Sequence, residues 1–215
     1  MAAKIVTIAQ QKGGAGKTTI AIQLAVTWAA RGHRVAMLDV DPQGSVSAWF
    51  SMRSTAQSTL VATDVPGWKL SGEIDRRRDD ADILVIDTPP HAETDARVAI
   101  RAASLVLVPL QPSPMDLWAT RPTLELVRRE KGRALMVLNR LPSRGRLADT
   151  IRQMIADENL PMAQATLGNR SAFAASMLEG KGVVETQPKG TAATEIRALA
   201  AEIGTLLALG TSTAA

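Results

Sequence analysis

Short apolar runs alternate with longer stretches of helical periodicity along the whole chain. The predicted strands cover residues 5–9, 34–38, 83–86, 104–108 and 134–138, with a weaker one at 162–165. The predicted helices cover 17–31, 92–102, 115–131, 147–158, 171–179 and 191–209. The strands are continuously apolar and do not alternate, which indicates burial on both faces of a parallel sheet. This pattern predicts an α/β fold: a doubly wound, mostly parallel sheet with helices on both faces.

The length of the chain, 215 residues, fits one domain. We expect a single domain over 1–209 and a disordered tail over 210–215. The stretch 51–82 is the hardest to interpret, because Pro66, Gly67 and Gly72 interrupt it and a charged run follows. We assign no strand to this stretch.

Composition excludes several kinds of chemistry. The chain has no cysteine, so disulfides, thiolate zinc sites, iron–sulfur clusters and cysteine nucleophiles are excluded. No apolar run reaches the length of a membrane span, and the first residues do not resemble a signal peptide. We therefore expect a cytoplasmic protein. The net charge of +4 matters only if it is clustered.

The strongest motif lies between the first predicted strand and the first predicted helix. Residues 12–19 read Lys-Gly-Gly-Ala-Gly-Lys-Thr-Thr. In such a loop the backbone N–H groups of Gly13, Gly14, Ala15 and Gly16 surround phosphates, aided by the helix N-terminus. Three side chains follow the glycines: Lys17 for the β- and γ-phosphates, the Thr18 hydroxyl for Mg²⁺, and Thr19. Gln11 stands where the general motif has its first glycine, and a glycine-rich turn without a ligand is the alternative.

Three further blocks complete a family resemblance. They are Asp39-Val40-Asp41-Pro42-Gln43-Gly44-Ser45, Ile83-Leu84-Val85-Ile86-Asp87-Thr88-Pro89-Pro90 and Val108-Pro109-Leu110-Gln111-Pro112-Ser113-Pro114. Together with residues 12–19, they resemble the deviant Walker A P-loop ATPases of the ParA/MinD family. The Asp-x-Asp-Pro-Gln form followed by Trp49 is most similar to the ParA branch. The resemblance implies ATP and Mg²⁺ as cofactors and ATP hydrolysis as the activity.

The resemblance also implies roles for charged residues. Lys12 corresponds to the lysine that reaches the phosphates of the partner subunit in an ATP-sandwich dimer. Asp41 corresponds to the carboxylate that orients the attacking water, so Lys12, Lys17 and Asp41 are the expected catalytic residues. Asp87 ends a buried strand and needs a strong partner, which Mg²⁺ supplies. Asp39 is expected to support the same ion, although either Asp39 or Asp41 is also suited to cap a turn or helix.

Asn139 and Arg140 close the predicted strand 134–138. In related ATPases an asparagine at this exit binds the adenine edge, and the next side chain packs on the ring. An amide suits adenine because it offers one donor and one acceptor. The alternative is that the asparagine serves the turn alone.

Basic residues cluster between 121 and 152, where nine arginines and lysines face three acids. Such a cluster is typical of a patch that binds a polyanion, with an affinity that falls as salt rises. Ordinary solvated surface is the alternative. The candidate DNA-binding residues are Arg121, Arg128, Arg129, Lys131, Arg133, Arg144 and Arg146.

The resemblance implies a positioning switch. We expect an ATP-dependent homodimer that binds non-specific DNA, associates with the nucleoid, and releases when a ParB-type or cargo adaptor protein stimulates hydrolysis. Few residues precede the first predicted strand, so we expect no helix-turn-helix extension. The alternative is a MinD-like switch at the membrane surface, but the last predicted helix has one cation and two acids, which disfavours membrane binding.

Overall fold

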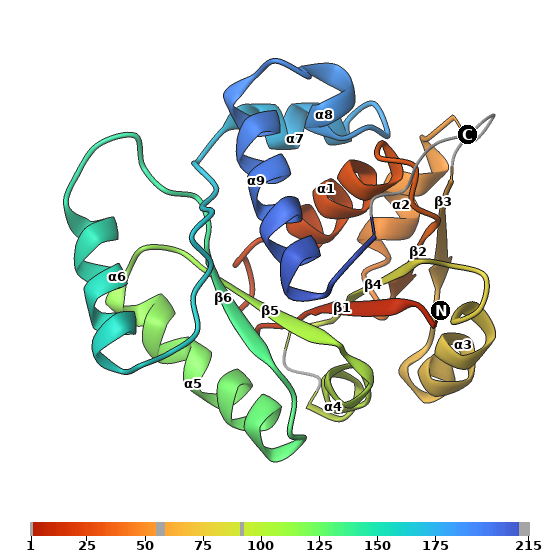
Figure 1. Ribbon diagram of the computed structural model, residues 1–215, viewed down its shortest axis with the longest axis horizontal. Coiled ribbons are helices and arrows are strands. Elements are labelled where there is room, and N and C mark those ends of the chain that lie inside the picture. The colour runs from red at the N-terminus through yellow and green to blue at the C-terminus, as the bar shows by residue number, and fades with distance from the viewer. Residues whose placement is uncertain (1, 55–58, 91–92, 211–215) are drawn as a thin grey trace.

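The computed structural model describes residues 2–54, 59–90 and 93–210. Within them six strands form one sheet: β1 (Lys4–Ile8), β2 (Val35–Asp39), β3 (Leu60–Asp64), β4 (Ile83–Asp87), β5 (Leu105–Leu110) and β6 (Ala134–Leu138). Their order is β3-β2-β4-β1-β5-β6, and all neighbouring pairs are parallel (Figure 1). The predicted doubly wound parallel sheet is confirmed.

Helices cover both faces of the sheet, as Figure 1 shows. One face carries α1 (Lys17–Ala29), α2 (Ser45–Ser51), α7 (Ser171–Met177), α8 (Val183–Thr186) and α9 (Thr191–Leu206). The other carries α3 (Leu70–Arg77), α4 (Glu93–Ala102), α5 (Pro114–Arg129) and α6 (Leu147–Asp157), with a 3-10 turn, η1 (Gly67–Lys69), before α3. Among the described helices, none is both long and apolar enough to cross a bilayer.

The central strand β1 shows why the apolar runs are continuous. Val6 and Ile8 are fully buried and pack with α1 and α9, while Ile5 packs on the opposite face with α3 and α4. Thr7 is buried on the α4 side as well, where its hydroxyl donates to the carbonyl of Ala99 at 3.0 Å. Both faces of the strand are therefore core.

The five strongly predicted strands match β1, β2, β4, β5 and β6 to within two residues at either end. The prediction missed β3, α2, α3 and α8. β3 is an edge strand that pairs only with β2 and is partly exposed, so it lacks a continuous apolar run. α2 and α8 have seven and four residues, which is too short for helical periodicity to appear.

The weak strand predicted at 162–165 is wrong. Met162 makes a single bridge to Met136 of β6. Ala163 N still donates to Met136 O, but the N–H groups of Gln164 and Ala165 donate to the Glu202 carboxylate of α9, at 2.9 Å each. A side chain from a distant helix thus takes the donors that a strand would need.

The helix predicted at 92–102 is α4, and Ala92 lies outside the described residues. The last helix ends at Leu206, earlier than the predicted residue 209. The tail predicted over 210–215 lies, apart from Gly210, outside the described residues, so that expectation stays a prediction.

Candidate nucleotide-binding and hydrolysis site

The carboxyl ends of parallel strands share one edge of the sheet, and the motifs meet there. The phosphate loop follows β1, Asp39 ends β2, Asp87 ends β4 and Asn139 follows β6. Asp39 and Asp87 lie opposite each other in the register of β2 with β4. Open α/β sheets bind ligands at this edge.

The phosphate loop requires glycine for two reasons. Gly14 and Gly16 have φ of 76° and 91°, in the left-handed region that side chains disfavour. At Gly16 a Cβ would also lie 2.3 Å from the amide nitrogen of Asn139. Gly16 is the N-cap of α1, and no side chain caps that helix. The first N–H groups of α1 are therefore suited to receive an anion.

Lys17 begins α1 and is buried at the loop. Burial lowers the pKa of its ammonium group, while the nearby carboxylates of Asp87 and Asp41 raise it. The expected phosphate-binding lysine thus lies beside the two expected carboxylates.

Thr18 and Asp87 form the part of the site that fits a metal ion. The Thr18 hydroxyl donates to Asp87 Oδ2 at 2.6 Å. Asp87 Oδ1 is buried and has no hydrogen-bond partner among the described residues. Burial raises the pKa of Asp87 to about 7, and the Asp39 charge acts in the same direction. A divalent cation would satisfy the unpaired oxygen and stabilise the ionised carboxylate, so these residues fit Mg²⁺.

The Asp39 carboxylate binds the first turn of α2, whose N-cap residue is Gly44. Its Oδ2 accepts from the N–H groups of Val46 and Ser47, at 2.9 and 3.2 Å, and its Oδ1 accepts from Asp41 N at 3.2 Å. Burial raises the pKa of Asp39 against these three hydrogen bonds. Both of its oxygens already serve the backbone, so the geometry favours the capping alternative over a ligand to the ion.

Asp41 lies on the loop between β2 and α2 and is partly buried. Its Oδ1 accepts from Gln43 N at 3.0 Å, which closes a turn. Asp39 holds the backbone of Asp41 from one side and the first turn of α2 from the other. The position of Asp41 relative to Lys17 therefore depends on how firmly α2 is held.

Lys12 forms an ion pair within its own chain. Its Nζ lies 2.6 Å from Asp116 Oδ2 on α5, and the Lys12 side chain remains 37% exposed. Ser113 donates to the same oxygen at 2.6 Å. Burial alone would raise the pKa of Asp116, but the Lys12 and Ser113 hydrogen bonds hold it below its usual value. Sequence reasoning missed Asp116, although Ser113 three residues before it marks a helix start.

A cavity of about 610 Å³ adjoins the loop on the β6 side. Asn139 lies at its wall, but its amide nitrogen donates to Ala15 O at 2.9 Å and its oxygen accepts from Arg140 N at 2.9 Å. The amide expected to bind adenine is thus already occupied by the protein, in line with the turn alternative. Sequence reasoning missed the α7 residues of this cavity. Its lining comprises Thr19, Gln111, Asn139, Arg140, Gly168, Asn169, Arg170, Ser171, Phe173 and Ala174.

The structure does not place the candidate DNA-binding residues on one patch. Arg128 lies in the last turn of α5, and Lys131 and Arg133 lie between α5 and β6, all at the amino edge of the sheet. Arg144 and Arg146 follow β6 and lie at the nucleotide edge. The remaining two pair with acids, since Arg121 lies 3.3 Å from Glu158 and Arg129 lies 2.5 Å from Glu125.

This site defines a class. An uncapped helix N-terminus behind left-handed glycines, a buried lysine and a hydroxyl bonded to a strand-end aspartate are the parts of a P-loop nucleotide site. Comparison with known proteins agrees. Residues 6–184 match the family described as the CobQ/CobB/MinD/ParA nucleotide binding domain. The chain therefore belongs to this family, whose ParA and MinD members are ATPases, and ATP and Mg²⁺ are its cofactors.

Relatives and solved structures extend the likeness over most of the chain. The maintenance of carboxysome distribution protein A of Halothiobacillus neapolitanus is 29% identical over 91% of this chain and 94% of its own length. Protein ParA of Rhizobium radiobacter is 31% identical over 59% of this chain and 57% of its own.

Two structures share the fold. MinD of Pyrococcus furiosus has a TM-score of 0.77 at 22% identity, covering 94% of this chain and 99% of that one. A variant of Cyanothece McdA in complex with ATP has a TM-score of 0.77 at 16% identity, covering 99% of both chains.

Proposed function

We propose that this ATPase forms an ATP-sandwich homodimer, binds DNA without sequence preference, and positions a cargo through hydrolysis that an adaptor protein stimulates. The observation that carries the proposal is the second lysine of the phosphate loop. Lys17 is buried beside the carboxylates, whereas Lys12 lies on the outer side of the loop and is 37% exposed. A lysine so placed is suited to reach phosphates that another copy holds.

The chain's own residues divide the work of hydrolysis. The N–H groups at the start of α1 and Lys17 hold and orient the phosphates. Thr18 and Asp87 would hold Mg²⁺, which neutralises charge on the phosphate oxygens when bound. Asp41 orients the attacking water, and Lys12 of the partner subunit offsets charge that develops on the γ-phosphoryl oxygens, as an arginine finger does.

Dimer formation requires Lys12 to change partners. Asp116 holds its ammonium group within the chain at 2.6 Å, and Ser113 donates to the same carboxylate oxygen. A triphosphate of another copy carries more negative charge than one carboxylate and can compete for it. The ion pair thus keeps Lys12 near the loop until a second copy with ATP docks.

A cargo-positioning role agrees with the named role of the Halothiobacillus relative, which concerns carboxysome distribution. The MinD-like alternative, a switch at the membrane surface, needs a free amphipathic helix. In α9 the residues Ile196, Leu199 and Ile203 are fully buried and belong to the core with α1. That helix is therefore already used for packing, which favours the DNA-bound switch and an association with the nucleoid.

A DNA titration tests the proposal. The protein is titrated with a non-specific duplex in ATP, in ADP and without nucleotide. We expect binding only in ATP, weakening steeply with salt because phosphate contacts release counterions. Lys17→Ala, which removes the phosphate contact, serves as the control and should lose the ATP response. Equal binding in all three states would contradict the proposal, and sedimentation with anionic vesicles in ATP would favour the membrane switch.

A further inference from the structure

The short helix α2, which follows the loop that carries Asp41, is held at both ends. At its start, the carboxylate of Asp39 caps α2 through Val46 N and Ser47 N. Its buried face carries Val46 and Trp49, which are almost inaccessible to solvent. A helix of seven residues has little stability of its own, so its position depends on such tertiary contacts.

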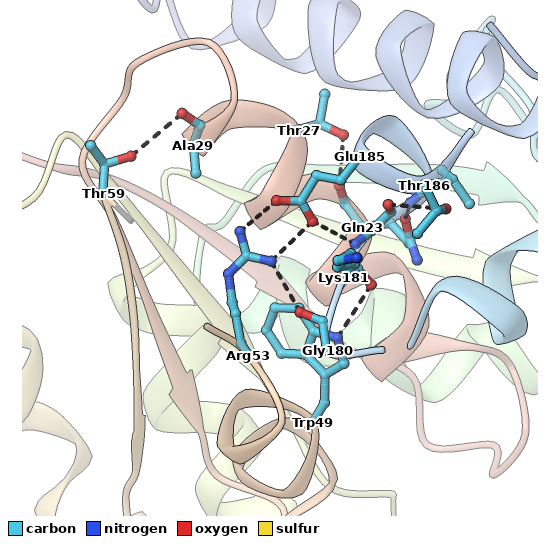
Figure 2. Close-up of polar contacts among 12 residues, drawn as sticks. Gln23, Thr27, Ala29, Trp49, Arg53, Thr59, Gly180, Lys181, Glu185 and Thr186 are labelled. Atoms are coloured by element: carbon cyan, nitrogen blue, oxygen red, sulfur yellow. Dashed lines mark hydrogen bonds and ion pairs between the residues drawn. The ribbon is translucent and has the colours of Figure 1, made fainter. Parts of the chain in front are cut away.

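At the other end, Arg53 joins α2 to the turn between α7 and α8 (Figure 2). Its guanidinium donates to both oxygens of Glu185, at 2.6 and 3.0 Å, and to the carbonyl of Gly180 at 3.0 Å. The Arg53 side chain is only 10% exposed. Burial would raise the pKa of Glu185, but the hydrogen bonds from Arg53 and Gly182 N lower it on balance. A two-pronged pair in these surroundings fixes orientation as well as distance.

The turn fits closely against the backbone of α2. Gly180 has a φ of 64°, and a Cβ there would lie 2.6 Å from Arg53 N and 2.7 Å from Met52 O. The indole of Trp49 donates to the carbonyl of Lys181 at 3.3 Å (Figure 2). The α7–α8 turn therefore contacts α2 through the backbone, an indole and an ion pair.

The same turn is fixed to the helix of the phosphate loop. Gln23 of α1 donates to Ser176 Oγ at 3.0 Å and accepts from Val183 N at 2.8 Å, and it is buried. Glu185 lies on the same short helix as Val183. Contacts therefore run from the phosphate loop through α1 and its Gln23 to α8, and from Glu185 of α8 through Arg53 to α2. Asp39, which binds the first turn of α2, also binds the backbone of Asp41.

We propose that Arg53 and Glu185 are positioning residues for ATP hydrolysis, holding α2 so that the Asp41 loop keeps its place relative to the phosphate loop. The inference rests on the proposed function of Asp41. Neither residue lines the cavity beside the phosphate loop. Replacing either residue should therefore change the geometry of the reaction and not the affinity for nucleotide. Displacements of about 1 Å are enough to cost up to about a hundredfold in rate.

The test compares Arg53→Gln and Glu185→Gln with wild type in steady-state ATP hydrolysis and in binding of a fluorescent ATP analogue. We expect kcat to fall about tenfold while KM and the analogue affinity stay within about threefold. Arg53→Lys keeps the charge but loses the two-pronged geometry, so it should regain part of kcat.

Arg34→Gln is the matched control. Arg34 forms an exposed ion pair with Asp82, in which two donors bind Oδ1 at 2.7 and 3.2 Å, and it precedes β2 at the opposite edge of the sheet. Because an exposed pair contributes little to stability, the control should keep its kcat and most of its stability.

Three results would overturn the inference: wild-type kcat in Arg53→Gln, an equal loss of kcat in Arg34→Gln, or loss of nucleotide binding in parallel with kcat. If Arg53→Gln does not fold, the same three criteria apply to Arg53→Lys. Absence of hydrolysis in the wild-type protein would instead refute the proposed function, so the two failures are distinguishable.

Discussion

Asp87 and Asp116 are both buried carboxylates near the phosphate loop, yet their pKa values shift in opposite directions. Burial raises the pKa of Asp87 to about 7, and the charge of Asp39 acts in the same direction, against the Thr18 hydrogen bond and the Lys17 charge. Asp116 has the Lys12 ammonium group 2.6 Å away, and its pKa is lowered despite burial. The positive charge near Asp87 is thus too small to offset its burial, which suits the carboxylate to bind a further cation, whereas Asp116 is already directly paired with one.

The Lys12–Asp116 pair gives a pH-dependent prediction. At pH 7, Lys12→Ala leaves Asp116 buried without its cation, and the free energy of unfolding should fall by about 1–2 kcal/mol, a value reduced by the partial exposure of Lys12. Because the folded pKa of Asp116 is lowered, the pair stabilises the fold above the ordinary value of 3.8 and ceases to do so as the pH falls through the folded pKa.

Urea unfolding at pH 7 and at about pH 3 measures this difference. The difference in the free energy of unfolding between wild type and Lys12→Ala should be smaller at the lower pH. Lys189→Ala, which removes a lysine from an exposed position, should change little at either pH. A gap of the same size at both pH values would mean that the two groups do not interact as the structure shows.

Among the secondary-structure elements, β6 places the basic residues at two opposite edges of the sheet. It separates Arg128 and Arg133, at the amino edge of the sheet, from Arg144 and Arg146, at the nucleotide edge. A contact controlled by ATP is more readily made at the edge where ATP binds. We therefore expect the proposed DNA contact to involve Arg144 and Arg146.

Paired charge reversals test this assignment. Arg144→Glu with Arg146→Glu should lower ATP-dependent DNA affinity at least about tenfold. The log–log slope of affinity against salt should become less steep by about 0.9 for each DNA phosphate that the variant no longer binds. Arg128→Glu with Arg133→Glu is the matched control and should stay within about threefold. Equal losses in both pairs, measured by fluorescence anisotropy, would place the DNA-binding surface on both edges.

For the whole molecule, the proposal requires that two copies face each other across the phosphate loops. Replacing Asp41 with alanine removes the group that we propose to orient water but leaves the loop, Lys17 and Lys12 in place. Asp41→Ala should therefore accumulate as a dimer in ATP and Mg²⁺, with about twice the 22.8 kDa mass of one chain. Light scattering during gel filtration measures this mass. Lys17→Ala should remain monomeric, and a monomeric Asp41→Ala protein in ATP would contradict the proposal.

Local sequence was sufficient for most of the sheet and for the phosphate loop. A strand buried on both faces is continuously apolar, and a loop that surrounds phosphates needs glycines next to a helix start, so both features appear within about ten neighbouring residues. The edge strand β3 and the short helix α2 gave no such signal. β3 is half solvated, and α2 depends on contacts made elsewhere in the chain.

The sequence by itself determined the class of site and named its candidate phosphate-binding residues, because these follow from adjacent positions. Only the tertiary structure decided which partners the charged side chains take. Lys12 and Asp116 are 104 residues apart in the chain, and Arg53 and Glu185 are 132 apart. No local pattern predicts such pairs, since the choice among many carboxylates is made by the packing of helices on the sheet.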